Sequence, residues 1–301
     1  MVDASRADPL ARAMPVIFVL IWSTGFIVAR YGMPHSPPMS FLAVRYALSI
    51  LCFLPWIWVF GVKWPTSRRQ WLHLSVTGVL MHAGYLGGVW AAVKSGMGSG
   101  LAALIVGIQP VLTAIWLSSM GGAEGHVTRR QWVGLLLGFA GLVLVVWRKF
   151  GSGGTGDHAD WWNLSLAVFA LFSITVGTLY HKRYVKACDV RSANTVQLIA
   201  ALLVTLPLAL LETETMRWNA ELVGAMAWSV IGLTLGGSSL LYLLIQRGAA
   251  AKVTSLMYLV PPCTALIAWV LFREPINAFT VAGIALTALG VSLVVRSPKP
   301  A

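Results

Sequence analysis

Two stretches decide the fold, GYLGGVWAAVKSG at 84–96 and GGSSLLYLLIQRG at 236–248, because the chain repeats itself through them. Both begin and end on glycine, and a shift of 152 residues overlays one on the other. The same shift pairs Gly25 with Gly177, Pro55 with Pro207, Leu104 with Leu256 and Pro110 with Pro262; a shift of 149 then pairs Gly134 with Gly283 and Gly141 with Gly290. Glycine and proline mark points at which membrane helices approach closely or bend. The chain therefore consists of two related halves.

Each half contains five apolar segments, an odd number, so the two halves must cross a bilayer in opposite directions. Inverted repeats of this kind are typical of secondary transporters, which hold their substrate near the midplane between the halves. The predicted spans run over 13–31, 40–60, 71–93, 98–119 and 131–148 in the first half, and over 161–181, 192–211, 223–245, 250–272 and 278–296 in the second.

The composition is that of a polytopic membrane protein. Of 301 residues, 57% are hydrophobic and 11% are charged, whereas a soluble domain carries about 25% charged residues. Ten spans of about 20 residues leave only short connections. The sequence thus predicts an all-α fold with ten transmembrane helices. Residues 1–150 form the first repeat and residues 151–301 form the second.

The formal net charge of +12 has an explanation other than nucleic acid. Lysine and arginine collect in cytoplasmic loops, and this bias alone makes many membrane proteins basic. Apart from Arg45, near the start of the second span, the basic residues fall mostly on the side that holds the N-terminus. The minority predicted on the opposite side are Arg30, Lys94, Arg148, Lys149, Arg217 and Arg273. This distribution predicts that both termini are cytoplasmic.

All ten acidic residues fall at or beyond the ends of the predicted spans. Ion-coupled pumps often bury a carboxylate at the midplane, since a charge there is costly and is tolerated mainly for function. Its absence argues against proton or sodium coupling through a carboxylate. Intramembrane enzymes that need H-E-x-x-H or paired aspartates are also disfavoured, because neither motif occurs. We therefore expect no enzyme, no cofactor and no metal site.

The one ionisable group predicted at mid-depth is His82, with Tyr85 one turn further along the third span. His82 fits two interpretations, a substrate or proton contact and a neutral hydrogen bond to a neighbouring helix. Trp22 lies near the middle of the first span beside Ser23 and Thr24. It fits lipid contact or core packing as well as a place in a cavity wall, which the polar neighbours favour.

Further candidates come from the repeat itself. Trp90 pairs with Tyr242, which Ser239 precedes by about one turn, and Gln109 directly precedes Pro110. Tyr258 lies one turn before Pro261. Aromatic and uncharged polar groups of this kind suit a modest organic solute with some apolar surface. Phosphate would instead require Arg or Lys at mid-depth, which the predicted spans do not provide.

The chain resembles the drug/metabolite transporter superfamily, in its EamA branch of ten-helix proteins. The resemblance covers nearly the whole chain and rests on Trp22-Ser-Thr-Gly-Phe26, Pro37-Pro38 followed by Arg45-Tyr46, the helices around Pro110 and Pro262, and Arg273-Glu274-Pro275. The overall pattern is most similar to YddG-type exporters of aromatic and other neutral amino acids. Ser23 stands where that pattern often has glycine. The resemblance implies a cavity lined by spans 1, 3, 4, 6, 8 and 9, with spans 5 and 10 peripheral.

The sequence and the resemblance together indicate a multi-pass exporter in a bacterial inner membrane that acts on amino acids or related metabolites by alternating access. We expect a monomer in the lipid bilayer with a small-molecule substrate and no nucleic-acid partner. The substrate contacts expected are Trp22, His82, Tyr85, Trp90, Gln109, Ser239, Tyr242 and Tyr258. Drug efflux and export of other metabolites remain alternatives. Sugar-phosphate exchange, an intramembrane enzyme and a channel are each less well supported.

Overall fold

The structure, a computed structural model, describes residues 9–119, 129–149, 158–237, 240, 259–274 and 276–295. The elements within these ranges are helices, which confirms the all-α prediction. Their bounds are α1 Pro9–Gly32, α2 Pro38–Val59, α3 Arg68–Gly78, η1 Val79–Gly84, α4 Tyr85–Lys94, α5 Ser99–Val106, α6 Gln109–Ser119, α7 Arg129–Lys149, α8 Trp161–Tyr184, α9 Val190–Leu210, α10 Ala220–Ala227, η2 Trp228–Gly237, α13 Val260–Phe272 and α14 Ala278–Val295.

These helices account for the ten predicted spans as far as they are described. Five helical stretches are long and apolar enough to cross a bilayer, and the longest of them joins α3, η1 and α4 over Arg68–Lys94. Five shorter apolar helices supply the remaining spans. The end of the eighth predicted span and the start of the ninth, residues 238, 239 and 241–258, lie outside the described residues, as does the predicted boundary between the repeats at 150.

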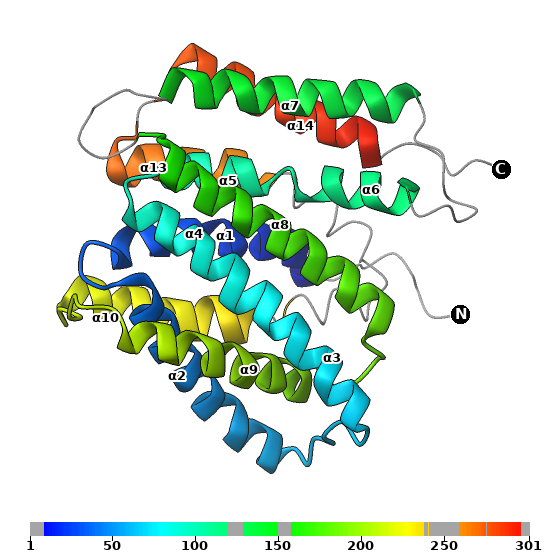
Figure 1. The fold of residues 1–301 in the computed structure, drawn as a ribbon, viewed down its shortest axis with the longest axis vertical. Helices are drawn as coiled ribbons and strands as arrows, with labels where there is room; N and C mark the ends of the chain where they lie inside the picture. Colours follow the sequence, from blue (N-terminus) through cyan, green and yellow to red (C-terminus); the bar gives the residue numbers. More distant parts are fainter. Residues whose placement is uncertain are drawn as a thin grey trace.

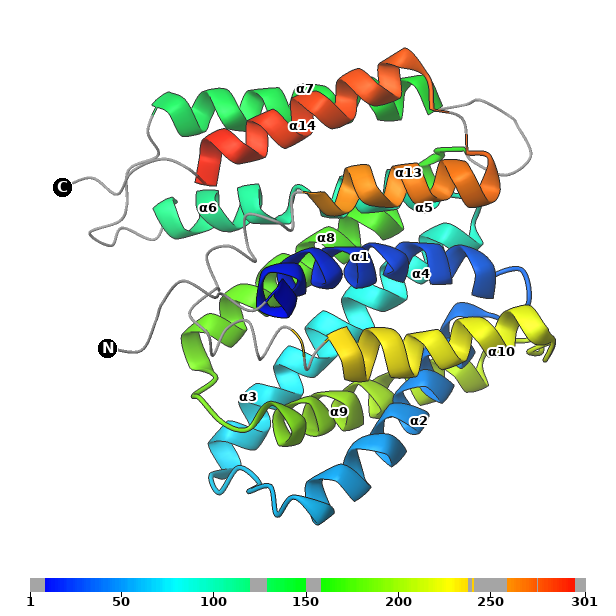
Figure 2. The same ribbon diagram turned by 180° about the vertical axis from the view of Figure 1, so that it is seen from behind.

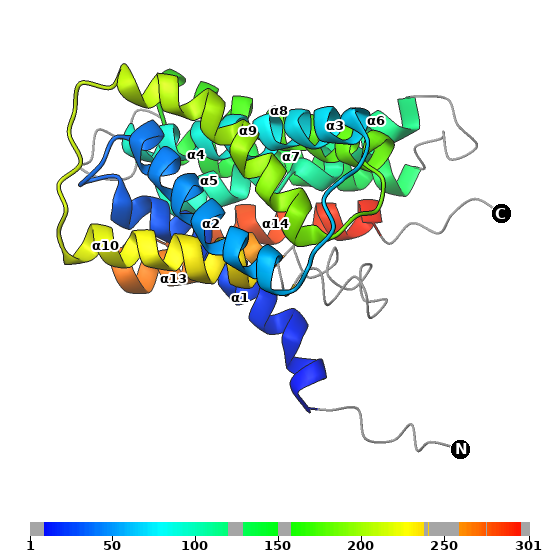
Figure 3. The ribbon, with the colours of Figure 1, turned by 90° about the horizontal axis from the view of Figure 1, so that it is seen from below.

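Helices at equivalent positions in the two halves run in opposite directions. Figure 1 shows α1 and α8 pointing in opposite directions, and the same holds for α2 with α9 and for α7 with α14. Seen from below, α1, α10 and α13 form one face of the bundle, while α3, α8 and α9 form the other (Figure 3). The pair α7 and α14 lies at one edge, away from this centre (Figure 2), as the resemblance implied for spans 5 and 10. The fold is thus a bundle of two inverted five-helix repeats.

Contacts between repeat-equivalent glycines show the twofold relation at residue level. A Cβ on Gly141 of α7 would meet the backbone oxygen of Gly283, and a Cβ on Gly290 of α14 would meet the backbone oxygen of Gly134. Because Gly283 is the repeat mate of Gly134 and Gly290 that of Gly141, the two contacts are one contact made twice. Only glycine allows backbones to approach this closely, which explains why glycines are the residues that the repeat retains.

Both halves also carry a π-helical segment at the same place. Adding the repeat shift of 152 to η1, Val79–Gly84, gives residues 231–236, which lie within η2, Trp228–Gly237. A π-helical turn leaves the ordinary helical hydrogen-bond pattern, and such turns are frequent at functional sites. The two π-helical segments therefore indicate that a functional site lies next to them.

The end of the bundle at which α1 ends and α2 begins is held by acidic residues from the second half. The N-cap residue of α2 is Pro37, whose side chain has no hydrogen-bond acceptor, so the start of α2 has no side-chain cap of its own. The backbone N–H groups of Met39 and Ser40 instead donate to the Glu212 carboxylate, over 2.9 Å and 2.8 Å. The Ser40 hydroxyl donates to it as well, over 2.7 Å. Glu212 thus caps a helix of the opposite repeat, where the helix dipole also favours a negative charge.

We expect Glu212→Ala to lower the free energy of unfolding by about 1–2 kcal/mol, because loss of a helix cap typically costs this much. The measurement is the apparent melting temperature of the purified protein in detergent. Glu214→Ala is the matched control, since Glu214 forms an exposed ion pair with Lys94 at 2.7 Å and such pairs contribute about 0–1 kcal/mol. Equal shifts for the two variants would contradict the capping role of Glu212.

Candidate functional site

A cavity of about 120 Å³ lies between the two faces of the bundle. For comparison, an apolar cavity of about 150 Å³ holds one benzene molecule. Its walls come from α1, α2, η1, α4, α8 and η2, so that both halves contribute. The lining residues are Trp22, Gly25, Phe26, Arg45, Met81, His82, Tyr85, Leu86, Val89, Trp90, Ile174, Leu233 and Thr234.

Several of these residues occupy equivalent positions in the two repeats. Met81 and His82 of η1 have Leu233 and Thr234 of η2 as their repeat mates, and all four line the cavity. A Cβ on Gly25 would lie 3.9 Å from Leu233. The cavity therefore lies between equivalent parts of the two halves, which is where an inverted-repeat transporter holds its substrate.

Neighbouring helices hold η1 in place by bonding to its backbone. The Tyr46 hydroxyl of α2 donates to the backbone oxygen of His82 over 2.9 Å. The Ser173 hydroxyl of α8 donates to that of Leu80 over 2.9 Å. These bonds engage backbone carbonyl groups in a segment that departs from the α-helical pattern, and polar groups buried this way need partners. His82 is thereby fixed at the cavity wall, where its side chain lies beside that of Gln197 of α9.

The two tryptophans proposed from the sequence both reach the cavity but in different surroundings. Trp22 of α1 is partly exposed and lies against Phe18, with ring centroids 5.3 Å apart. Trp90 of α4 is 1% exposed and packs on Phe41, with centroids 4.4 Å apart. Trp22 therefore has surface available for a solute, whereas most of the Trp90 ring is occupied by the protein core.

The other proposed residues are distributed as follows. Tyr85 lines the cavity beside His82. Gln109, at the start of α6, is not among the lining residues; its side-chain amide lies 3.4 Å from the Thr178 hydroxyl of α8. Ser239, Tyr242 and Tyr258 lie outside the described residues. The structure thus brings Trp22, His82, Tyr85 and Trp90 to one cavity, and their contact with substrate stays a prediction.

Arg45 corrects the expectation that His82 is the one ionisable group at mid-depth. Its side chain is 8% exposed and lines the cavity from α2. The guanidinium donates to the Thr234 hydroxyl oxygen of η2, from Nε over 3.3 Å and from Nη2 over 3.2 Å. By sequence, Arg45 lies near the start of the second predicted span, and the Arg45-Tyr46 pair is part of the family pattern. The signal available was an arginine inside an apolar segment, which is itself a mark of function.

Span 2 therefore joins the walls that the resemblance implied, through Arg45. Of the implied walls, spans 1, 3, 6 and 8 contribute described residues. None of the lining residues comes from the described parts of spans 4 and 9, which are α5, α6 and α13. The resemblance thus indicated the position of the cavity but not its charge.

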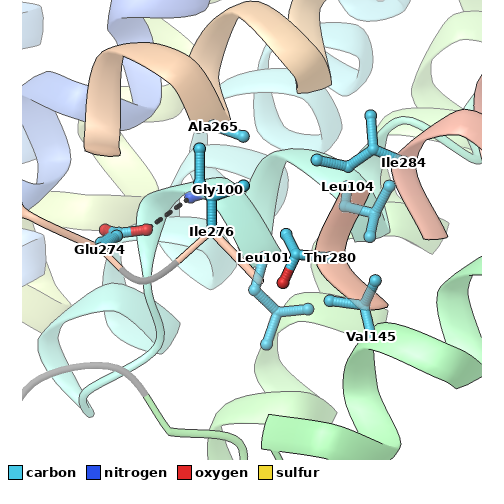
Figure 4. Close-up of a pocket in the computed structure, with 9 residues that line it drawn as sticks. All are labelled: Gly100, Leu101, Leu104, Val145, Ala265, Glu274, Ile276, Thr280 and Ile284. Carbon is cyan, nitrogen blue, oxygen red and sulfur yellow. Dashed lines mark hydrogen bonds between the residues drawn. The ribbon is translucent and has the colours of Figure 1, made fainter. Parts of the chain in front are cut away.

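A smaller cavity lies between α5, α7, α13 and α14 (Figure 4). Its volume of about 20 Å³ leaves room for roughly one water molecule. Glu274, 6% exposed, turns toward the start of α5, where the Ser99 backbone N–H donates to it over 3.1 Å and the Ser99 hydroxyl over 3.0 Å. Arg273 ends α13 in a left-handed conformation, at φ 53°. The Arg273-Glu274 pair of the sequence motif thus ends one helix and caps another, which is a structural role.

Comparison with known proteins agrees with this architecture. The EamA-like transporter family matches residues 10–147 and again residues 161–296. An uncharacterized transporter of Archaeoglobus fulgidus is 26% identical over 286 residues, covering 91% of this chain and 93% of its own. The uncharacterized inner membrane transporter YedA of Escherichia coli is 25% identical over 263 residues, covering 86% and 81%.

Two further proteins are similar to this chain, one in sequence and one in fold. A protein of Salmonella typhimurium described as a probable amino-acid metabolite efflux pump is 22% identical over 288 residues, covering 92% of each chain. A solved crystal structure superposes with a TM-score of 0.64 at 16% identity, covering 94% of this chain and 98% of the other. At that identity the superposition speaks for the fold alone. The family match extends over nearly the whole chain and includes both sets of helices around the cavity, so this multi-pass membrane protein belongs to the EamA-like transporter family.

Proposed function

We propose that this protein exports amino acids, aromatic and other neutral ones, or related metabolites across a bacterial inner membrane by alternating access. The observation that carries the proposal is the cavity lined by equivalent positions of two inverted halves. Its aromatic walls suit a solute with an apolar part, since flat rings stack on one another favourably. The name of the Salmonella typhimurium relative supports the same substrate class.

In this proposal both termini lie in the cytoplasm, because the lysines and arginines cluster on that side. The end at which α1 ends then faces away from the cytoplasm. There the two halves are tied together by Glu212 on Ser40 and by Lys94, which donates to Glu214. Alternating access requires these bonds to break when that end opens.

The monomer is proposed as the working unit, since the cavity is formed within one chain. Catalysis is not part of the proposal. Export of other metabolites or of drugs is the alternative, and Arg45 bears on it directly. The sequence disfavoured anionic solutes because it predicted no cation at mid-depth. Arg45 does line the cavity, so this argument against anionic solutes does not hold.

The test is counterflow of labelled L-phenylalanine into liposomes that contain only the purified protein. We expect uptake above that of empty liposomes with sodium absent and the membrane potential clamped, since no described carboxylate lines the cavity. Trp22→Ala is expected to slow counterflow several-fold, through loss of one aromatic contact of about 1 kcal/mol.

Trp58→Ala is the matched control, because Trp58 is 84% exposed near the end of α2 and does not line the cavity. Both variants are compared at equal protein content. The proposal fails if wild-type liposomes exchange neither phenylalanine nor other neutral amino acids. A strict sodium requirement would instead point to an ion site formed by carbonyl and hydroxyl oxygens.

A further inference from the structure

Arg45 is a buried cation for which the described protein provides no counter-charge. The ion pairs of the described residues involve other side chains, and its hydrogen bonds go to the neutral Thr234 hydroxyl. The undescribed residues nearest in sequence to η2, 238, 239 and 241–258, include no aspartate or glutamate. Taking an unpaired charge out of water is expensive. A cation kept at a cavity wall in this state is suited to receive an anion there.

Thr234 orients the guanidinium without neutralising it. The single hydroxyl proton of Thr234 is donated to the backbone oxygen of Ser229 over 2.9 Å, within η2. The lone pairs of that oxygen are therefore left to accept from Arg45. Guanidinium carries five N–H donors in a planar fork, and the bonds to Thr234 use only Nε and Nη2. Donors remain for a ligand in the cavity that Arg45 lines.

In the other half of the molecule the equivalent position carries a neutral residue. The repeat mate of Arg45 is Gln197 of α9, and the mate of Thr234 is His82. The Gln197 side chain lies beside His82, as Arg45 lies beside Thr234. The same contact between halves is thus made once by a neutral amide and once by a guanidinium. The positive charge is surplus to the structural contact.

We propose that Arg45 binds the carboxylate of the transported solute, while the aromatic walls around Trp22 and Tyr85 hold its apolar part. The solute class is then a monocarboxylate with an apolar side chain. Arginine suits this task because its planar fork matches a carboxylate through two parallel hydrogen bonds. The identification of that solute as an amino acid rests on the proposed function, whereas the requirement for a carboxylate does not.

The test measures equilibrium binding by calorimetry to the purified full-length protein in detergent. The probes are 3-phenylpropanoate and its amide, 3-phenylpropanamide, which share a shape and differ in charge. We expect the wild type to bind the acid at least about tenfold more tightly than the amide. Arg45→Gln, which copies the residue of the other half, is expected to weaken binding of the acid by about tenfold to a hundredfold and to leave the amide within twofold.

Arg68→Gln serves as the control, since Arg68 is exposed at the start of α3, and it should bind both probes as the wild type does. If the wild type prefers neither probe, or binds neither, the inference is wrong. It is also wrong if Arg45→Gln weakens both probes equally, which would mark a structural role. Should Arg45→Gln fail to fold, the wild-type preference for the acid decides by itself.

The outcomes separate this inference from the proposed function. Binding of the acid that depends on Arg45, together with no phenylalanine counterflow, would support the carboxylate site and overturn amino-acid export. Counterflow of phenylalanine that equals that of phenylalaninamide and is unchanged in Arg45→Gln would support export and overturn the carboxylate site.

Discussion

Trp90→Ala is expected to lower the free energy of unfolding by about 3–5 kcal/mol, the range for truncating a buried aromatic residue to alanine. Trp90 is 1% exposed, packs on Phe41 at a centroid distance of 4.4 Å and lies against Gly32 of α1. Removing the indole leaves a hole that these helices cannot close without moving. Transport by this variant should then fall because less folded protein reaches the membrane.

The measurement combines the apparent melting temperature in detergent with transport per folded molecule. Trp58→Ala is again the control, because Trp58 is 84% exposed and its truncation opens no internal hole. Trp90→Phe should recover much of the lost stability by refilling part of the space. If Trp90→Ala melts like the wild type and yet fails to transport, the residue contacts substrate directly and the core role assigned here is wrong.

Gly78→Ala is expected to be the most damaging single-methyl addition near the cavity. Gly78 ends α3 where it crosses α9, and a Cβ there would lie 2.6 Å from the Cα and 2.7 Å from the carbonyl carbon of Gln197. Backbone atoms cannot turn aside as a side chain can, so the two helices must separate. We expect a loss of about 3 kcal/mol, at the upper end of the range for overpacking, and displacement of Gln197 from His82.

Gly224→Ala provides the matched control on α10, where an added Cβ would have nothing within 4 Å. That variant should gain stability by about 0.5–1 kcal/mol, the difference in helix propensity between the two residues. Unfolding of both variants is followed in detergent by the same assay. A Gly78→Ala protein that is as stable as the wild type would mean that α3 and α9 are packed less closely than the structure places them.

The apolar segments and the glycine spacing were enough to predict the ten spans and the two inverted halves, whereas the family was indicated by the resemblance of short motifs such as Trp22-Ser-Thr-Gly-Phe26 and Arg273-Glu274-Pro275. These features are local in sequence, because a bilayer requires each crossing segment to be long, apolar and internally hydrogen-bonded. The repeat adds long-range information, since Gly141 and Gly283 are retained where two backbones touch. His82 and Tyr85 could also be predicted from the sequence, because they are polar residues in the middle of a long apolar segment.

Only the tertiary structure decided the charge of the cavity. By sequence Arg45 stands close to the start of a predicted span, yet α2 begins at Pro38, so that the arginine lies about 10 Å along the helix. Because α2 packs within the bundle, the Arg45 side chain points inward and contacts Thr234 of the other half. The separate roles of Trp22 and Trp90 were equally undetermined: both line the cavity, but the Trp22 ring is partly exposed whereas the Trp90 ring is buried against Phe41. Span periodicity determines which residues enter the membrane, whereas helix crossing determines which of them face one another.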